Sequence, residues 1–144
     1  MFSATPATPG QPTKLPLLIP FPVAFLSPSG EEMPVQLASE DEAPLPGTRM
    51  FELTQEHTEL VFGGLAVKPA VSLNRGFAAP VILDQGLSDE ELAFLARHET
   101  DPFNRWDAMN RLLINAVHTQ TRAKLLRTPE EVSPLVITAA LEVL

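Results

Sequence analysis

The 144-residue chain contains no cysteine, which excludes disulfides, thiolate zinc sites, iron–sulfur clusters and a cysteine nucleophile. Tyrosine is absent as well. No apolar run reaches the ~20 residues that a membrane-spanning helix needs, and residues 1–10 lack the basic start and apolar core of a signal peptide. We therefore expect no membrane partner, and a cytoplasmic location fits these features.

Basic residues are also scarce, with 10 Lys and Arg against 18 Asp and Glu and a formal net charge of −8. A nucleic-acid interface needs clustered Lys and Arg, and so does an anionic membrane surface. The charge balance therefore argues against a nucleic-acid partner.

What the chain does contain is enough apolar residues, 44% of the total, to form a folded core. Its composition changes near Leu87. Short β-rich runs and most of the 15 prolines precede this point, and helix signals follow it. Strands followed by helices predict an α+β chain or two separate domains.

The first predicted strand, Leu15 to Leu26, has apolar residues at every second position, which places them on one face. They are Leu15, Leu17, Ile19, Phe21, Val23 and Phe25. Pro16, Pro20 and Pro22 all fall at even positions, so their missing N–H groups share one lateral side. Proline is tolerated where that side is unpaired, which predicts an edge strand.

A turn at Ser27–Gly30 precedes a predicted returning strand, Met33 to Leu37. The remaining strand candidates are Arg49–Thr54, Glu59–Phe62, Val71–Phe77 and Val81–Leu83. Short strands at this spacing are typical of a sandwich or barrel.

Helix starts are marked more clearly than strands. Ser88 and Glu91 form a capping box, S-x-x-E, and Leu87 with Leu92 occupy the hydrophobic-staple positions. Asp101-Pro102 supplies an N-cap acid and a proline in the first helical position. Two further starts are predicted at Thr128-Pro129-Glu130-Glu131 and at Ser133-Pro134.

The second predicted helix carries apolar residues at three- and four-residue steps, which predicts one buried face. They are Phe103, Trp106, Met109, Leu113, Ala116 and Val117. We expect Trp106 to anchor the packing of this helix, and its replacement by Ala to cost about 3–5 kcal/mol if it is buried. Phe77 and Val81 are expected on the sandwich side.

The last segment, Leu135 to Leu144, has only Thr138 and Glu142 as polar residues. A helix that is apolar nearly all round is buried on several sides. The simplest expectation is a piece of a longer protein, and the alternative is a second copy that covers this surface by self-association.

The histidines give no metal motif. His98-Glu99-Thr100-Asp101-Pro102 begins like H-E-x-x-H, but proline stands where the second ligand is needed. A helix-end histidine exposed to solvent is the interpretation for His98. His118 and His57 are interpreted as structural.

The acidic clusters are interpreted as helix caps or solvated loops. They are Glu31-Glu32, Glu40-Asp41-Glu42, Asp89-Glu90-Glu91 and Glu130-Glu131. Gly63-Gly64 lacks a phosphate-binding pattern, and no serine lies in a G-x-S-x-G motif. Arg105-Trp106-Asp107 could form a cation–π contact or a surface ion pair. The sequence therefore predicts no catalytic, cofactor-binding or metal-binding residue in this chain.

Four stretches together resemble one family. Thr8-Pro9-Gly10-Gln11, continued by Lys14 and Pro16 to Pro20, is similar to the T-P-G-Q-x-x-K-x-P-x-x-I-P segment of bacterial aminopeptidase N, a gluzincin-type zinc exopeptidase. Leu73 to Val81 resembles its L-x-R-G-F-S-A-P-V run. Leu87 to Leu92 is similar to the entry into its C-terminal helical region. Asp101 to Ala108 resembles its D-x-F-x-R-W-D/E-A motif.

The resemblance implies an extended lead-in over residues 1–14, an immunoglobulin-like β-sandwich over 15–86, and the first helices of a C-terminal helical domain over 87–144. It also implies that a family strand lies upstream of residue 1. The family's zinc motif and its G-x-M-E-N motif are absent here, so no site residue is carried over.

Our hypothesis is a non-catalytic linker segment of a zinc-dependent aminopeptidase, whose parent chain would supply zinc, the catalytic domain and the rest of the helical domain as partners. This segment alone would not be an enzyme, whereas the parent would. The first alternative is a freestanding immunoglobulin-like interaction module with a helical appendage. The second is an independent metalloenzyme, which the missing ligands disfavour.

Overall fold

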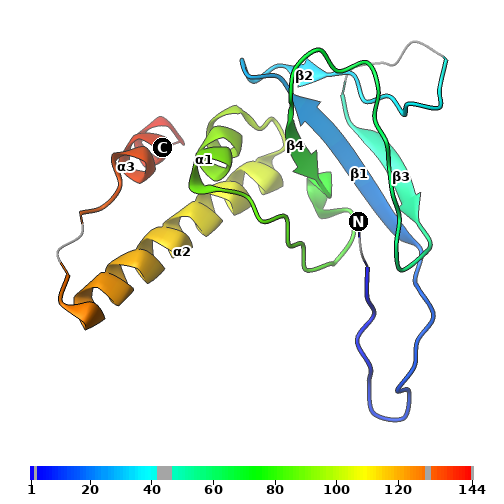
Figure 1. Ribbon diagram of the computed structural model, residues 1–144, viewed down its shortest axis with the longest axis horizontal. Helices are drawn as coiled ribbons and strands as arrows, with labels where there is room; N and C mark the ends of the chain where they lie inside the picture. Colours follow the sequence, from blue (N-terminus) through cyan, green and yellow to red (C-terminus); the bar gives the residue numbers. More distant parts are fainter. Residues whose placement is uncertain (2, 42–46, 129–130, 144) are drawn as a thin grey trace.

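A computed structural model describes residues 1, 3–41, 47–128 and 131–143. Four strands come first: β1 (Ile19–Leu26), β2 (Glu32–Met33), β3 (Arg49–Leu53) and β4 (Ala70–Leu73). A 3-10 turn, η1 (Arg75–Phe77), leads to three helices: α1 (Asp89–His98), α2 (Pro102–Leu126) and α3 (Pro134–Val143). The strands form an antiparallel sheet on one side of the molecule, and the helices lie together on the other (Figure 1). The predicted α+β order is confirmed.

The long strand is central in the sheet, so the prediction of an edge strand is wrong. β1 pairs with β2, β3 and β4. The register explains how two prolines are accommodated, because Ile19 to Val23 pair with β3 while pairing with β4 begins only at Val23. Pro20 and Pro22 thus lie where β4 has not yet begun, and the side that lacks N–H donors needs no partner.

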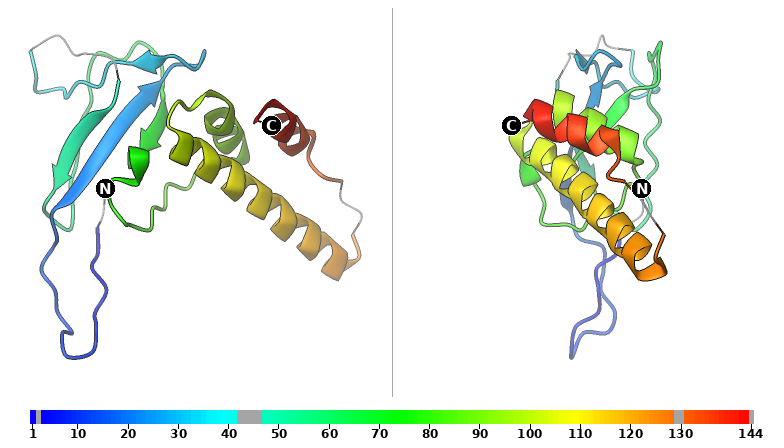
Figure 2. Two further views of the ribbon diagram at one scale, coloured as in Figure 1. Left: turned by 180° about the vertical axis from the view of Figure 1, so that it is seen from behind. Right: turned by 90° about the vertical axis from the view of Figure 1, so that its left-hand side faces the viewer.

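The period-two pattern holds only in the second half of the predicted strand. Phe21, Val23 and Phe25 are buried in one apolar cluster with Phe51 and Leu53. Leu15 and Leu17 are 84% and 61% exposed, in a lead-in that extends away from the sheet (Figures 1 and 2). The alternation of apolar residues therefore began four residues before the strand did.

Of the other predicted strands, some are present and some are not. β3 matches its prediction to within one residue, whereas β2 covers only Glu32–Met33. Leu37 and Phe62 form an isolated bridge instead of two paired strands. β4 ends at Leu73, because left-handed Asn74 (φ 54°) turns the chain into η1. Residues 81–83 form no strand.

The helix starts follow the local signals. The Ser88 hydroxyl accepts from the Glu91 N–H at 3.2 Å, and the Glu91 carboxylate accepts from the Ser88 N–H at 3.0 Å. Asp101 caps α2, with Pro102 as the first helical residue. α3 begins at Pro134 as expected. The predicted start at Thr128 falls partly outside the described residues, and residues 131–133 are not helical.

The predicted apolar face of α2 is largely exposed. Met109 is buried, but Trp106 is 59% and Val117 is 62% exposed. The helix instead buries Ala108, Met109 and Leu112 in a core shared with α1 and α3. The sequence periodicity predicted one apolar face of α2, but contact with α1 and α3 buries a different face.

Trp106 therefore does not anchor this packing. The cost of about 3–5 kcal/mol depended on burial, and most of the side chain is in solvent. We expect Trp106→Ala to lower the free energy of unfolding by less than about 1 kcal/mol, and Leu112→Ala, at 0% exposure, by about 2–5 kcal/mol. Urea denaturation of both variants measures this difference, and equal midpoint shifts would contradict it.

Candidate functional site

A densely hydrogen-bonded polar group lies where the sheet meets the helices, around the buried guanidinium of Arg75. Its Nη1 donates to Glu32 Oε1 at 2.7 Å and to Thr48 Oγ1 at 2.8 Å. Its Nη2 donates to Glu99 Oε1 and, at 2.8 Å, to Thr100 Oγ1. We call these five residues the Arg75 cluster.

The cluster joins parts of the chain that are far apart in sequence. Glu32 lies in β2, Thr48 precedes β3, and Arg75 begins η1 directly after β4. Glu99 and Thr100 form the turn between α1 and α2. Thr100 also donates to Glu32 Oε1 at 2.7 Å. One side chain thus holds the turn of the helical pair against the sheet.

The backbone on both sides of Arg75 adopts left-handed conformations, which turn the chain where β4 ends. Asn74, Gly76 and Phe77 have φ values of 54°, 66° and 50°. The Asn74 side chain supports this loop, since its Nδ2 donates to the Ala79 carbonyl at 2.9 Å and its Oδ1 accepts from the Ala79 N–H at 3.0 Å. Asn and Gly tolerate the left-handed region, whereas an aromatic residue there is strained.

The start of α2 reinforces the same contact. Asp101 caps the helix through Oδ1, which accepts from the Asn104 N–H at 2.9 Å, while its Oδ2 accepts from the Gly76 N–H at 3.0 Å. Asn104 donates from Nδ2 to Ser72 Oγ at 2.8 Å and to the Leu73 carbonyl at 2.9 Å. The helix cap therefore also serves as a bond between helix and sheet.

The electrostatics favour the charged forms of Arg75 and Glu32. Burial acts to lower the pKa of Arg75, but its hydrogen bonds to Glu99 and Glu32 outweigh this effect, and the net shift is upward. Hydrogen bonds from Thr100 and Arg75 lower the pKa of Glu32. Glu99 is 2% exposed, and a carboxylate so deeply buried needs this cation beside it.

Sequence reasoning missed the role of these residues. Arg75 and Asp101 stood in two separate family motifs, Leu73 to Val81 and Asp101 to Ala108, and the structure brings these motifs together. Glu99 was considered only as part of a failed zinc motif. A buried glutamate carries no local signal, because its cation lies 24 positions earlier in the chain.

The histidines of the sequence analysis lie apart from this cluster. His98 ends α1 and is half-buried with its ring 4.6 Å from that of Phe94, so it is more enclosed than predicted. His57 and His118 are exposed. Among the residues that the structure describes, no three His, Asp or Glu side chains form a group that could hold a metal ion.

Two acidic clusters predicted to be solvated loops contain paired carboxylates. Glu32 belongs to the Arg75 cluster, and Glu40 is bonded to Arg49, with side chains 33% and 34% exposed. Glu91 serves the helix cap as predicted. Glu42 and Glu130 lie outside the described residues. Asp107 pairs with Arg111 at 3.8 Å, rather than with Arg105.

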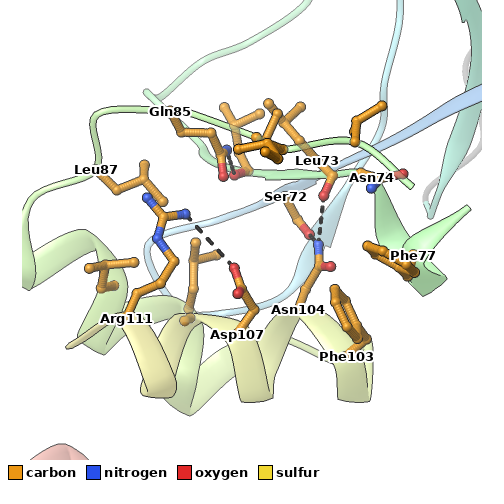
Figure 3. A pocket seen from close by; sticks show the side chains of 17 residues that line it. Ser72, Leu73, Asn74, Phe77, Gln85, Leu87, Phe103, Asn104, Asp107 and Arg111 are labelled. Carbon is orange, nitrogen blue, oxygen red and sulfur yellow. Dashed lines mark hydrogen bonds and ion pairs between the residues drawn. The ribbon is translucent and has the colours of Figure 1, made fainter. Parts of the chain in front are cut away.

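A pocket of about 270 Å³ lies beside the cluster, between β4, the segment 81–87 and the helices α1 and α2 (Figure 3). A row of three aromatic side chains begins with Phe77 and Phe103, which line the pocket, and continues to Trp106, which does not. The ring of Phe77 is 4.8 Å from that of Phe103, which is 5.8 Å from that of Trp106. Phe77 follows β4 on the sheet side of the chain, but it is 48% exposed and its ring contacts Phe103 of α2 rather than the apolar cluster of the sheet.

No helix within the described part of the chain is long and apolar enough to cross a membrane. The fold defines the class of protein, an immunoglobulin-like β domain followed by a helical region. Residues 3–86 match the family described as a domain of unknown function (DUF3458) with an Ig-like fold, and residues 89–144 match DUF3458_C, described as ARM repeats. The chain belongs to the DUF3458 family.

Its relatives confirm the resemblance to aminopeptidase N. Aminopeptidase N of Escherichia coli (strain K12) is 38% identical over 109 residues, which are 76% of this chain and 12% of that protein. Aminopeptidase N of Haemophilus influenzae is 30% identical over 141 residues, 94% of this chain and 15% of that protein. The chain thus spans less than one sixth of the length of either relative.

A solved structure shows the same fold. Aminopeptidase A of Legionella pneumophila, crystallised in complex with aspartic acid, superposes with a TM-score of 0.65 at 23% identity. The match covers 85% of this chain and 13% of that one.

Removing the positive charge of Arg75 should lower the free energy of unfolding strongly. Arg75→Met leaves Glu99 buried without its counter-charge, and we expect a loss of about 3–5 kcal/mol in the free energy of unfolding. Arg49→Met is the matched control, because it breaks the partly exposed pair between β3 and Glu40 and should cost much less than Arg75→Met. Similar losses in thermal or urea unfolding would contradict the central role of Arg75.

The Arg49–Glu40 pair predicts a pH effect. Hydrogen bonds from Arg49 and from the Leu37 N–H lower the pKa of Glu40 to about 2. A carboxyl whose pKa falls on folding stabilises the folded state above its unfolded pKa, here 4.5, and this contribution disappears as the pH drops through about 2.

An NMR titration of the Glu40 carboxyl carbon should therefore show a midpoint near pH 2. In Arg49→Gln the midpoint should move upward toward 4.5. A midpoint that is the same in both proteins would show that Arg49 does not hold the pKa down.

Proposed function

We propose that this chain is a non-catalytic structural segment of a zinc-dependent aminopeptidase, an enzyme that removes N-terminal amino acids from peptides. In this proposal the segment links a catalytic domain to a C-terminal helical domain and sets their relative orientation. The observation that supports the proposal most strongly is the Arg75 cluster, in which buried ion pairs hold the sheet against the turn between α1 and α2.

The homology supports this proposal. The chain is similar to parts of two proteins named aminopeptidase N, and those parts are 12% and 15% of their lengths. A cytoplasmic location is part of the same proposal.

The zinc of the proposed parent does not fit the residues described here. They provide no group of three or more His, Asp or Glu side chains with metal-binding geometry. No step of peptide hydrolysis is therefore assigned to this chain. Zinc and the water that it activates would belong to the catalytic domain of the parent.

The helices support a partner role for the rest of the helical domain. Leu141 and Ile137 on α3 are 73% and 50% exposed, and Leu125 and Leu126 at the end of α2 are 79% and 63% exposed. Repeats of the ARM type bury such faces against the next repeat. We propose that further helices of the parent, or a second copy of this chain when it is isolated, cover these surfaces.

The exposed apolar faces of α2 and α3 also separate this proposal from a freestanding immunoglobulin-like module. A self-contained module would be a monomer at all concentrations, whereas unpaired helical faces favour association. We expect the isolated chain to show a concentration-dependent sedimentation coefficient, to contain no stoichiometric zinc, and not to cleave L-alanine p-nitroanilide.

Each outcome has a clear meaning. Bound zinc with cleavage of the anilide would overturn the non-catalytic role. A strictly monomeric chain that binds no apolar dye would favour the freestanding module. The variant Leu141→Gln should weaken the association, and Glu59→Gln, at an exposed position outside the helices, is the control that leaves the apolar faces intact.

A further inference from the structure

The pocket beside the Arg75 cluster has the features of a small-molecule site. Its volume is about 270 Å³, and its base is formed by Leu92, Leu95 and Ala108, which are 1%, 7% and 3% exposed. The wall opposite α2 is the edge of β4 with the segment 81–87 (Figure 3). A cavity of about 150 Å³ with such a lining admits benzene, so this pocket has room for a branched aliphatic or aromatic side chain.

The amide nitrogens of Asn104 and Gln85, two residues that line the pocket, are already hydrogen-bonded to β4. Asn104 Nδ2 is bonded to Ser72 and to the Leu73 carbonyl, and Gln85 Nε2 donates to the Val71 carbonyl at 3.5 Å. These two amides thus donate hydrogen bonds to backbone carbonyls of β4. The interior of the pocket therefore offers an apolar environment rather than hydrogen-bonding groups.

Two opposite charges stand together at its edge. Asp107 and Arg111, one helical turn apart on α2, rise toward the segment Gln85–Leu87 (Figure 3). Their closest atoms are 3.8 Å apart, and their side chains are 41% and 28% exposed. Within the described residues each has the other as its ion-pair partner. A loose, partly exposed pair is held weakly, so a ligand that carries both charges can replace it.

We propose that this pocket binds a free α-amino acid with an apolar side chain. The ligand's ammonium group would bind Asp107, its carboxylate would bind Arg111, and its side chain would occupy the apolar interior. This arrangement exchanges one loose ion pair for two and removes apolar surface from water. The proposal rests on the pocket alone, so it and the proposed function can fail separately.

The test uses the 144-residue chain and four probes. In two-dimensional ¹H–¹⁵N NMR, L-leucine should shift the amides of residues that line the pocket, with weak, saturable binding. Glycine lacks the side chain, isopentylamine lacks the carboxylate, and 4-methylpentanoate lacks the ammonium group. Each should bind at least about fivefold more weakly than L-leucine.

Variants assign the roles of the residues. Arg111→Gln should weaken L-leucine binding about fivefold and leave isopentylamine binding unchanged. Asp107→Asn should weaken L-leucine binding about fivefold and leave 4-methylpentanoate binding unchanged. Arg122→Gln, an exposed position on the same helix, is the matched control and should change nothing. Ala108→Leu should abolish binding by filling the pocket, whereas Ala116→Leu should not.

Several results would overturn the proposal. They are an absence of shifts with L-leucine, equal shifts with glycine, or L-leucine binding that neither charge variant weakens. If Ala108→Leu fails to fold, as judged by circular dichroism, the two charge variants still decide the outcome. Shifts confined to residues outside the pocket would also count against it.

Discussion

The structure depends on one buried cation shared by the two halves of the molecule. Arg75 extends from the end of the sheet and is bonded to Glu32 on one side and to Glu99 on the other. A buried guanidinium and a buried carboxylate are each costly alone, and they are tolerated because each compensates the other. The sheet and the helical pair therefore cannot separate without exposing or isolating these charges.

This constraint explains the local features around it. The left-handed residues Asn74 and Gly76 turn the chain directly after β4, and Asp101 caps α2 while it accepts from the Gly76 N–H. The same residues thus end a strand, begin a helix and join the two. Two apolar clusters complete the arrangement, one under the sheet around Phe25 and one between the helices around Leu112. Leu26, at the end of β1, belongs to the helical cluster.

A joint of this kind is consistent with the proposed role as a structural segment of a larger peptidase. Its relatives are several times longer, and the polar bonds fix the direction in which α2 leaves the sheet (Figure 2). The pocket lies at the same joint and is lined by residues of β4, α1 and α2. A ligand held there would contact both the edge of β4 and the helices, so the structural role and a binding role would meet at one place.

The sequence by itself determined the features that depend on neighbouring residues: the cap at Ser88, the Asp101-Pro102 start of α2, the alternation of Phe21, Val23 and Phe25, and the order of strands before helices. These follow from local hydrogen bonding and periodicity. Only the tertiary structure decided that β1 is central, that Trp106 is exposed, and that Arg75 meets Glu99. Each of these is set by partners from distant parts of the chain, and a single sequence carries no local signal for them.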